Sequence, residues 1–381
     1  NVGHGHPRII GAIRGQIDKI LHYSLTESYC QSVVYLAEQI CKIVPGAFRK
    51  RVFYTSSGSE AVETALKMLK WHTRKQLFLA YANAFHGETI GALSLSASKL
   101  VRRRHFFPLM PGVVHVPYPY CFRCPFKRSL ENCDFFCIEY IEECVLEKYA
   151  PPENVAAFFV EPIQSEGYIV PPEGYFKRLK KILDEHRISM VDDESQTGIG
   201  RTGRWFAIEH WDVEPETVCL SSAAASGLPF GATVSRTDLM DWEECSHANT
   251  LGGNQMACAV GLAVLETIRQ EHLLENSARQ GNYLLKRLRE MKEEHEIIGD
   301  VRGKGLMIGV EIVESRRCNS PQSDDAANLV KKCFRKGLLL ATCGRSSVRI
   351  APPLITTREL VEAALEILEV AIKEVMHEKR N

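Results

Sequence analysis

The stretch that decides the fold is ISMVDDESQTGIGRTGRWFA, residues 188–207. Its apolar beginning, residues 188–191, is typical of a buried strand in a parallel sheet, and a polar, glycine-rich loop follows it. Ligands of open α/β sheets lie at the carboxyl ends of such strands. Asp193, at this strand end, has two interpretations: an acid that caps the loop 196–200, or a counter-ion for a protonated ring nitrogen.

Apolar runs that predict strands alternate with helical periodicity on both sides of this stretch. The predicted strands are residues 51–55, 77–80, 155–161 and 188–193, and the predicted helices lie within 9–44, 58–74 and 173–186. Near-continuous apolar strands that alternate with helices predict a mainly parallel sheet with both faces covered. The large part of the chain is therefore expected to be an α/β domain.

A different order of elements begins after about residue 254. A long helical stretch, 254–296, is followed by a strand at 306–312, a helix at 324–336, short strands at 338–342 and 347–350, and a helix at 357–376. We therefore expect a remnant of an N-terminal segment over residues 1–30, a large domain over 31–264 and a small α+β domain over 265–381. Because the chain opens inside helical periodicity, we expect a further segment to precede it.

Composition excludes several classes of function. Of 381 residues, 45% are hydrophobic and 25% charged, and 47 Lys+Arg balance 47 Asp+Glu, which argues against nucleic acid or an anionic membrane as partner. No apolar run reaches the roughly 18 residues of a membrane span, and no signal-peptide pattern opens the chain. Thirteen cysteines, mostly single, are typical of reduced thiols, so we expect a cytoplasmic protein.

Polar groups also follow the other predicted strands. Ser57, Gly58 and Ser59 stand where a strand meets a helix, as an anion site or as a plain N-cap. Phe85 follows a strand end, where it either stacks on a planar ligand or packs in the core. Each of these signals is weak when it is taken alone.

Two further signals concern carboxylates. The loop 161–167 carries Glu161, Gln164 and Glu166 directly after a strand, which is too polar for a simple turn. Arg349 lies in an apolar strand, where it is expected either to pair with an acid of the protein or to bind a ligand carboxylate through two parallel hydrogen bonds.

Together, these motifs resemble one family over nearly the whole chain. Their order is similar to that of the class III (subgroup II) aminotransferases of the 4-aminobutyrate and ornithine type, pyridoxal-phosphate enzymes of fold type I. The most specific matches are the stretch from Asp193 to Ala207 and His247-Ala248-Asn249-Thr250-Leu251-Gly252-Gly253-Asn254. The resemblance implies an aspartate-aminotransferase-like fold, pyridoxal 5'-phosphate as cofactor, a homodimer with shared sites, and amino-acid and 2-oxo-acid substrates.

The resemblance also assigns roles residue by residue. The implied cofactor contacts are Ser57, Gly58 and Ser59 on the phosphate, Phe85 on the ring, His86, Glu161, Asp193 on the ring nitrogen, Gln196 near the ring hydroxyl, Ser222 beside the ring, and Thr250 from the neighbouring subunit. Arg349 would bind a substrate carboxylate, with Glu166 as its switchable partner. That pair would let one site accept an ω-amine and the α-carboxylate of 2-oxoglutarate in turn.

The chain departs from the family at its catalytic position. The family's Schiff-base lysine lies 29 residues after the aspartate, and counting from Asp193 reaches Ser222, in CLSSAAASGLPFGA (219–232). No lysine occurs between Lys181 and Lys286. The two catalytic positions are then Asp193 and Ser222. Because serine cannot form a Schiff base and is a weak base near neutral pH, we expect very slow turnover.

Three interpretations of the function stay open. The chain is an ω-amino-acid transaminase crippled at Ser222, a racemase or epimerase of the same family, or a non-catalytic protein that binds pyridoxal phosphate. The serine itself is either a deliberate replacement that traps a bound form or the mark of a degenerate paralogue. The amino donor is not identified by the sequence.

A cysteine pattern stands apart from these motifs. Cys121, Cys124, Cys133 and Cys137 have the spacing C-x2-C-x8-C-x3-C. The pattern fits a four-cysteine zinc site or an iron–sulfur site, or else a loop that carries reduced thiols. The sequence leaves this choice open, and we assign no metal ligand from it.

Overall fold

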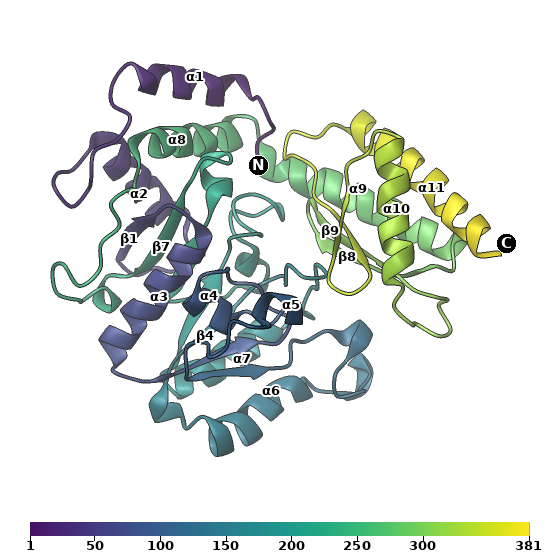
Figure 1. The fold of residues 1–381 in the computed structure, drawn as a ribbon, viewed down its shortest axis with the longest axis horizontal. Coiled ribbons are helices and arrows are strands. Elements are labelled where there is room, and N and C mark those ends of the chain that lie inside the picture. Colours follow the sequence, from purple (N-terminus) through teal and green to yellow (C-terminus); the bar gives the residue numbers. More distant parts are fainter. Residues whose placement is uncertain (381) are drawn as a thin grey trace. The chain divides into compact units, whose positions relative to one another are not determined.

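The computed structural model describes residues 1–380. The chain divides into two compact units, which Figure 1 shows as a ribbon. Unit 1 comprises Asn1–Pro162, Pro171–Ile199 and Trp205–Glu271, and unit 2 comprises Ile163–Val170, Gly200–Arg204 and the chain from His272 onward. Two short segments of unit 2 are therefore supplied by the loops that follow strands of unit 1.

Unit 1 is built on a seven-stranded sheet with the order β1-β7-β6-β5-β4-β2-β3. The strands are β1 (Lys50–Thr55), β2 (Leu77–Tyr81), β3 (Val113–Val116), β4 (Val155–Val160), β5 (Ser189–Asp193), β6 (Thr217–Leu220) and β7 (Gly231–Arg236). Pairing is parallel from β3 through β6, and β7 runs antiparallel to both of its neighbours. The prediction of an α/β fold with a mainly parallel sheet is confirmed, and five strand ends with polar residues meet at one edge.

Unit 1 also contains helices. They are α1 (Pro7–Ile17), α2 (Gln31–Ile43), α3 (Gly58–Thr73), α4 (Ile90–Leu95), α5 (Leu100–Arg103), α6 (Phe136–Tyr140), α7 (Tyr175–Glu185) and α8 (Gln255–Gln270). Of these, α2, α3, α4 and α7 contact strands of the sheet and α1 packs on α8. Short turns of 3-10 or π helix are η1 (Cys121–Arg123), η2 (Leu130–Asn132), η3 (Ile141–Tyr149), η4 (Pro152–Asn154), η5 (Ala207–Trp211), η6 (Ser222–Ala225) and η7 (Thr237–Leu239). Within the described residues, no helix combines the length and apolarity that crossing a bilayer requires.

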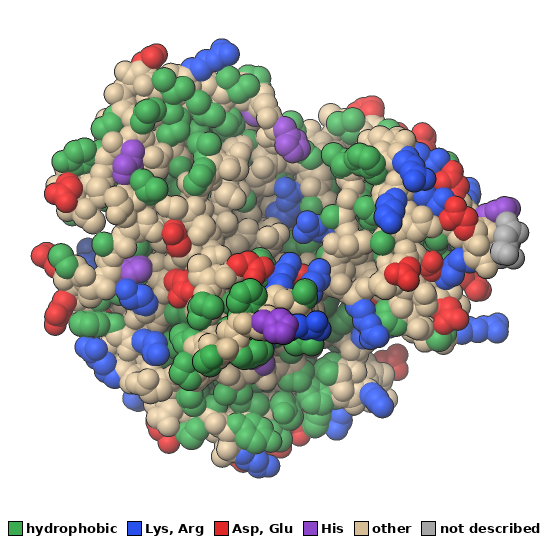
Figure 2. Space-filling model, viewed as in Figure 1, with side chains coloured by type: hydrophobic (Ala, Val, Ile, Leu, Met, Phe, Trp, Pro, Cys, Tyr) green, Lys and Arg blue, Asp and Glu red, His purple; other side chains and the backbone are tan. Residues whose placement is uncertain are grey.

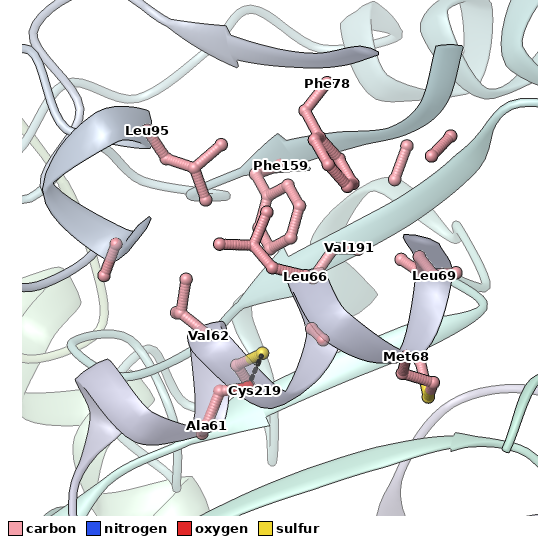
Figure 3. Close-up of a cluster of buried hydrophobic side chains, with 14 of the residues drawn as sticks. Ala61, Val62, Leu66, Met68, Leu69, Phe78, Leu95, Phe159, Val191 and Cys219 are labelled. Atoms are coloured by element: carbon pink, nitrogen blue, oxygen red, sulfur yellow. Dashed lines mark hydrogen bonds between the residues drawn. The ribbon is translucent and has the colours of Figure 1, made fainter. Parts of the chain in front are cut away.

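The core between α3 and the sheet fixes where α3 begins. Figure 3 shows Leu66 of the helix facing Phe78 of β2 and Phe159 of β4, all fully or almost fully buried. The Cys219 thiol of β6 donates to the Ala61 carbonyl at 3.6 Å. Burying each such large side chain stabilises the fold by about 1.5–3 kcal/mol. The first turn of α3 is thereby held beside the ends of the strands.

Unit 2 contains a four-stranded antiparallel sheet with the order β10-β11-β9-β8. Its strands are β8 (Ile298–Lys304), β9 (Met307–Ile312), β10 (Ala341–Cys343) and β11 (Ser347–Ile350). Its helices are α9 (Leu273–Glu294), α10 (Ser323–Arg335) and α11 (Arg358–Arg380). This unit has the α+β composition that the sequence predicts.

The structure differs from the predicted elements at several places. Strands β3, β6 and β7 have no counterpart among the predicted strands. The helical stretch 254–296 is two helices, because His272 adopts a left-handed conformation (φ 50°) that ends the first one. Residues 298–304 form a strand that the sequence analysis did not predict. Gly305 (φ 52°) turns the chain from this strand back into β9. The short strand expected at 338–342 is Ala341–Cys343.

Candidate active site

Asp193 ends β5 as a buried carboxylate with two hydrogen-bond donors. Its Oδ2 lies 2.8 Å from Nδ1 of His86, and its Oδ1 accepts the Ser195 backbone N–H at 3.1 Å. Asp193 is 3% exposed, and His86 is equally buried. Two donors from different loops fix the direction of the carboxylate, so it is held ready to face a cation at the strand end.

The charge of His86 follows from its neighbours. Burial lowers the pKa of its imidazole, but the hydrogen bond to Asp193 and the negative charges of Asp193 and Glu161 outweigh burial and raise the pKa overall. The hydrogen bond between the imidazole and the carboxylate orients both side chains at the end of β5.

The first turn of α3 forms an anion-binding cradle. The Ser57 hydroxyl caps the helix by accepting the Glu60 N–H at 3.2 Å, and the Glu60 carboxylate accepts the Ser56 N–H at 2.7 Å. The N-cap interpretation is thus correct, yet the cap leaves the N–H groups of Gly58 and Ser59 without a partner inside the helix. Such free N–H groups at a helix N-terminus bind phosphate.

The absence of a side chain at Gly58 shapes this cradle. A Cβ there would come within 3.0 Å of the hydroxyl oxygens of Ser195 and Ser221. Two hydroxyls from the loops after β5 and β6 therefore line the same space as the helix N-terminus. The backbone of α3 can be approached closely only because residue 58 is glycine.

Phe85 lies between a carboxylate and a guanidinium. Its backbone N–H donates to Oε2 of the buried Glu161 at 3.0 Å, which ties the loop after β2 to the end of β4. The half-buried ring carries the guanidinium of Arg102 at 4.4 Å from its centre. The loop thus presents an aromatic ring in a fixed place, as stacking on a planar ligand requires.

Ser222 opens a short turn directly after β6. The turn η6 is closed by the Gly227 N–H, which donates to the Ser222 carbonyl at 2.9 Å, and Ser226 and Gly227 both have positive φ. The Ser222 side chain is half-buried. The only chemistry it brings to this strand end is a hydroxyl, which neither forms a Schiff base nor accepts a proton readily near neutral pH.

Two predicted cofactor residues are exposed on the single chain. Within the described residues, neither Gln196 nor Thr250 forms a side-chain hydrogen bond with another predicted site residue. Thr250 follows Asn249, whose Nδ2 donates to the Glu60 carboxylate at 3.1 Å. The loop is therefore anchored to the start of α3 while Thr250 itself faces outward.

The two predicted substrate residues belong to unit 2. Oε2 of Glu166 accepts the Gly344 N–H at 2.7 Å, and the residue is buried. Arg349 is exposed on β11 and hydrogen-bonds Tyr168. Both residues thus lie in one compact unit, Glu166 held by backbone and Arg349 accessible.

Two carboxylates next to Asp193 escaped the sequence interpretation. Asp192 is completely buried, and neither of its oxygens has a hydrogen-bond donor among the described residues. Burial, and then the charge of Glu194, raise the pKa of Asp192 well above its ordinary value. Burial raises the pKa of Glu194 to about 7, against hydrogen bonds from Thr197 and backbone N–H groups. The acidic run 192–194 was the available signal.

Sequence reasoning also missed Ser195, Ser221 and Arg102. Ser195 lies two residues after the predicted strand 188–193, so its place was a usable signal, whereas Ser221 follows β6, which the sequence analysis did not predict. Arg102 lies on α5, and no motif or spacing connects it with Phe85.

The site fits a planar, phosphorylated cofactor with a ring nitrogen. Two buried polar atoms, Oγ of Ser195 and Nε2 of His86, have no hydrogen-bond partner among the described residues, and each can form a hydrogen bond with a ligand. The cradle at Gly58, the ring of Phe85 and the carboxylate of Asp193 supply an anion site, a stacking surface and a counter-ion. This combination on a mainly parallel sheet defines a pyridoxal-phosphate protein of fold type I.

Comparison with known proteins gives the family. The model of the class-III aminotransferases matches residues 1–372, so the chain belongs to this family of pyridoxal-phosphate enzymes, as the sequence predicted. The chain is 39% identical over 377 residues to a leucine/methionine racemase of Thermococcus litoralis, covering 98% of this chain and 84% of the relative. It is 33% identical over 377 residues to a probable 4-aminobutyrate aminotransferase of Bacillus subtilis, covering 98% and 86%.

A solved structure agrees. An amine transaminase from an uncultivated Pseudomonas species, in a PLP-bound form, superposes with a TM-score of 0.91 and 30% sequence identity. The superposition covers 98% of this chain and 88% of that chain. Pyridoxal phosphate is therefore the cofactor of this fold and family.

Proposed function

We propose that this chain binds pyridoxal phosphate at the strand ends of unit 1, on a scaffold built to move an amino group from an ω-amino acid to 2-oxoglutarate. We further propose that turnover by this chain is very slow because residue 222 is a serine. The observation that carries the proposal is the contrast at neighbouring strand ends, where Asp193 has its supporting donors and Ser222 offers only a hydroxyl.

The described residues would divide the work of binding. The N–H groups of Gly58 and Ser59 would hold the phosphate, Phe85 would stack on the ring, and Asp193 would keep the ring nitrogen protonated. When it is bound, the cofactor supplies an electron-withdrawing ring that stabilises negative charge on the substrate carbon. Glu161 positions Phe85 through its backbone N–H. None of these tasks requires the missing lysine.

The missing task is proton transfer. In this family the lysine amine moves a proton between the substrate carbon and the cofactor, and positioned general acid–base groups contribute about 10²–10⁴-fold to rate. Ser222 cannot take this role without a base beside it, and none of its hydrogen bonds links it to one. Binding without appreciable turnover is the expected state of the chain.

Substrate selection would fall to Glu166 and Arg349. An exposed arginine binds a carboxylate with two parallel hydrogen bonds, and release of Glu166 from the Gly344 N–H would let it approach a cation instead. This supports substrates that present an amine in one half-reaction and a carboxylate in the other. The substrate class is thus an ω-amino acid, paired with a dicarboxylic 2-oxo acid.

We also propose a cytoplasmic homodimer. Figure 2 shows hydrophobic side chains gathered over α1 and α2. Exposed apolar side chains of this region include Ile17, Leu21 and Tyr29, the last 88% exposed. Thr250 faces outward beside its anchored loop, as a contact to a partner's phosphate requires. All thirteen cysteines are free thiols, which favours a reducing compartment.

A racemase is the second candidate, because the racemase of Thermococcus litoralis shares 39% of its residues with this chain and the aminotransferase of Bacillus subtilis shares 33%. Racemisation and transamination both begin with removal of the same proton. They differ in whether the proton returns to the substrate carbon. The two activities are therefore separable by product.

The test restores the amine at residue 222. We expect the unmodified chain to bind pyridoxal phosphate by equilibrium dialysis without the absorbance of a lysine-bound cofactor. Ser222→Lys should gain that absorbance and transfer amino groups from 4-aminobutyrate to 2-oxoglutarate about 10²–10⁴-fold faster than the unmodified chain. Ser222→Met, of similar length but without an amine, is the matched control.

The outcomes separate the candidates. Chiral chromatography of leucine and alanine with the Ser222→Lys variant reports racemisation, and amino transfer to 2-oxoglutarate reports transamination. Racemisation without transfer would replace the transaminase proposal by the racemase. Failure of the unmodified chain to bind the cofactor would overturn the binding proposal itself.

A further inference from the structure

Four cysteines far from the cofactor residues in sequence line one small cavity. Cys121 and Cys124 come from the turn η1, and Cys133 and Cys137 from η2 and the start of α6. The cavity measures about 20 Å³. These two cysteine pairs lie in the connection between β3 and β4, inside unit 1.

A tight turn adjoins each pair. The Lys127 N–H donates to the Cys124 carbonyl at 3.0 Å, directly after the first pair, and the Phe136 N–H donates to the Cys133 carbonyl at 2.8 Å, directly before Cys137. Two residues separate Cys121 from Cys124, and three separate Cys133 from Cys137. Short C-x2–4-C pairs on turns are the usual way in which proteins present two of four thiolate ligands.

Aromatic side chains form much of the rest of the lining, together with prolines, Leu130 and the charged Arg128. Phe126 packs edge-on against Phe136 at 5.0 Å, and its ring centre lies 5.2 Å from that of Tyr140.

The ligand set indicates the kind of metal centre. Four cysteines in two closely spaced pairs, with no histidine or carboxylate among the residues that line the cavity, are a ligand set of structural zinc. An iron–sulfur cluster uses the same ligands, and the metal analysis below distinguishes the two.

The thiols still have to approach one another. Among residues 1–380, only Glu294, His295 and Glu369 bring three potential ligand atoms within 4.8 Å of one another, so the thiols are not at coordination spacing. With zinc–sulfur bonds of about 2.3 Å, tetrahedral sulfurs lie about 3.8 Å apart. None of the four cysteines lies on a strand, so the contraction involves only the connection between β3 and β4.

We propose that Cys121, Cys124, Cys133 and Cys137 bind one zinc ion as four thiolates and so fasten the connection between β3 and β4. Binding converts the thiols to thiolates and releases their protons to solvent, with no change of oxidation state. The cavity also includes Tyr118, whose hydroxyl donates to the carbonyl groups of Glu161 at 3.0 Å and Pro162 at 3.2 Å. The proposed zinc site would therefore stabilise the end of β4, where Glu161 positions Phe85.

The test measures metal in the full chain, purified without chelators and without added metal. Elemental mass spectrometry should find one zinc ion per chain, and the double variant Cys121→Ser/Cys124→Ser should lose it. The double variant Cys245→Ser/Cys318→Ser, which removes two exposed cysteines elsewhere, should keep it. Zinc retained by the first variant would overturn the proposal.

A second measurement does not depend on folding of the variant. The unmodified chain, stripped of metal and loaded with cobalt(II), should show the sulfur-to-cobalt charge-transfer and intense visible bands of a tetrahedral four-thiolate site. Iron in place of zinc, a disulfide among the four cysteines in non-reducing mass spectrometry, or no metal with all four thiols titratable would each overturn the proposal. None of these measurements depends on amino transfer, so the result is independent of the proposed function.

Discussion

The ends of β5 and β6 are neighbours in the sheet and opposites in chemistry. Asp193 pairs with Cys219 across the two strands, so the residues that follow them emerge side by side. At the end of β5, a carboxylate is oriented by His86 and by the Ser195 N–H. At the end of β6, Ser222 opens a turn that is held by its backbone alone.

Under the proposed function, this difference assigns binding and proton transfer to separate strand ends. Asp193 and Glu161 each hold a neighbouring loop by a hydrogen bond, and Ser57 caps the first turn of α3. We therefore expect that residue 222 can be changed without moving the proposed binding groups.

The largest expected effect comes from Asp193 in the lysine-restored background. Asp193→Asn combined with Ser222→Lys should lower kcat by about 10²–10³-fold relative to Ser222→Lys alone, because a neutral amide no longer holds the proton on the ring nitrogen. Steady-state amino transfer measures this. Asp193→Glu, which keeps the charge, should recover part of the loss, and an Asn variant with undiminished kcat would contradict the role of Asp193.

Asp192 offers the second contrast, because it adjoins Asp193 on β5 but has no donor. Its folded-state pKa lies above the ordinary value of 3.8, so ionisation costs the folded state free energy as pH rises from 3.8 through that raised pKa. Glu194 adds a similar loss between 4.5 and about 7. Asp192→Asn should therefore raise the free energy of unfolding by about 2 kcal/mol near neutral pH and leave it unchanged at acid pH.

Denaturant unfolding at several pH values measures this effect. The control is Asp18→Asn, which changes an exposed acid at the end of α1 and should shift stability by less than about 0.5 kcal/mol. An equal gain at acid and neutral pH would show that the effect of Asp192→Asn does not arise from its charge.

Much of the fold was predictable because it rests on short-range patterns. The apolar run that became β4 is uninterrupted, and the strand–helix junction at Ser57 carries its own capping residues. The break at His272 was not predictable, because a left-handed residue other than glycine leaves no mark in hydrophobic periodicity.

The site was predictable where a motif lies in one stretch and unpredictable where space joins distant stretches. A strand end singled out Asp193 and the family's spacing singled out Ser222, whereas the contact of Arg102 with the Phe85 ring depends on how α5 folds back. Likewise, the lack of a hydrogen-bond donor at Asp192 among the described residues depends on which side chains pack around β5, and the sequence does not predict this packing. Family resemblance supplied roles, and the structure supplied the partners of each side chain.

A substitution at Thr250 tests whether a second chain contributes to the cofactor site at the ends of β5 and β6. Thr250→Val should weaken cofactor binding by about 1.5 kcal/mol, roughly tenfold, since it removes one hydrogen bond to a charged group. Fluorescence titration of pyridoxal phosphate measures the affinity. Thr342→Val, at an exposed threonine of β10 in unit 2, should have no effect. The loss should disappear when the protein is diluted to a monomer, and a loss that persists would place Thr250 in its own chain's site.

The smallest expected effect is at Phe85, which belongs to the binding side of the comparison. Phe85→Leu keeps an apolar side chain but removes the ring face, and stacking of aromatic rings contributes about 0.5–1.5 kcal/mol beyond buried area. The affinity for pyridoxal phosphate should fall about fivefold, while the backbone N–H still donates to Glu161. Phe106→Leu, at an exposed phenylalanine that follows α5, is the matched control. Because the change touches no proton-transfer group, kcat of the Ser222→Lys background at saturating cofactor should stay the same. A fall in kcat instead of affinity would mean that the aromatic ring, and not the strand end at residue 222 alone, takes part in catalysis.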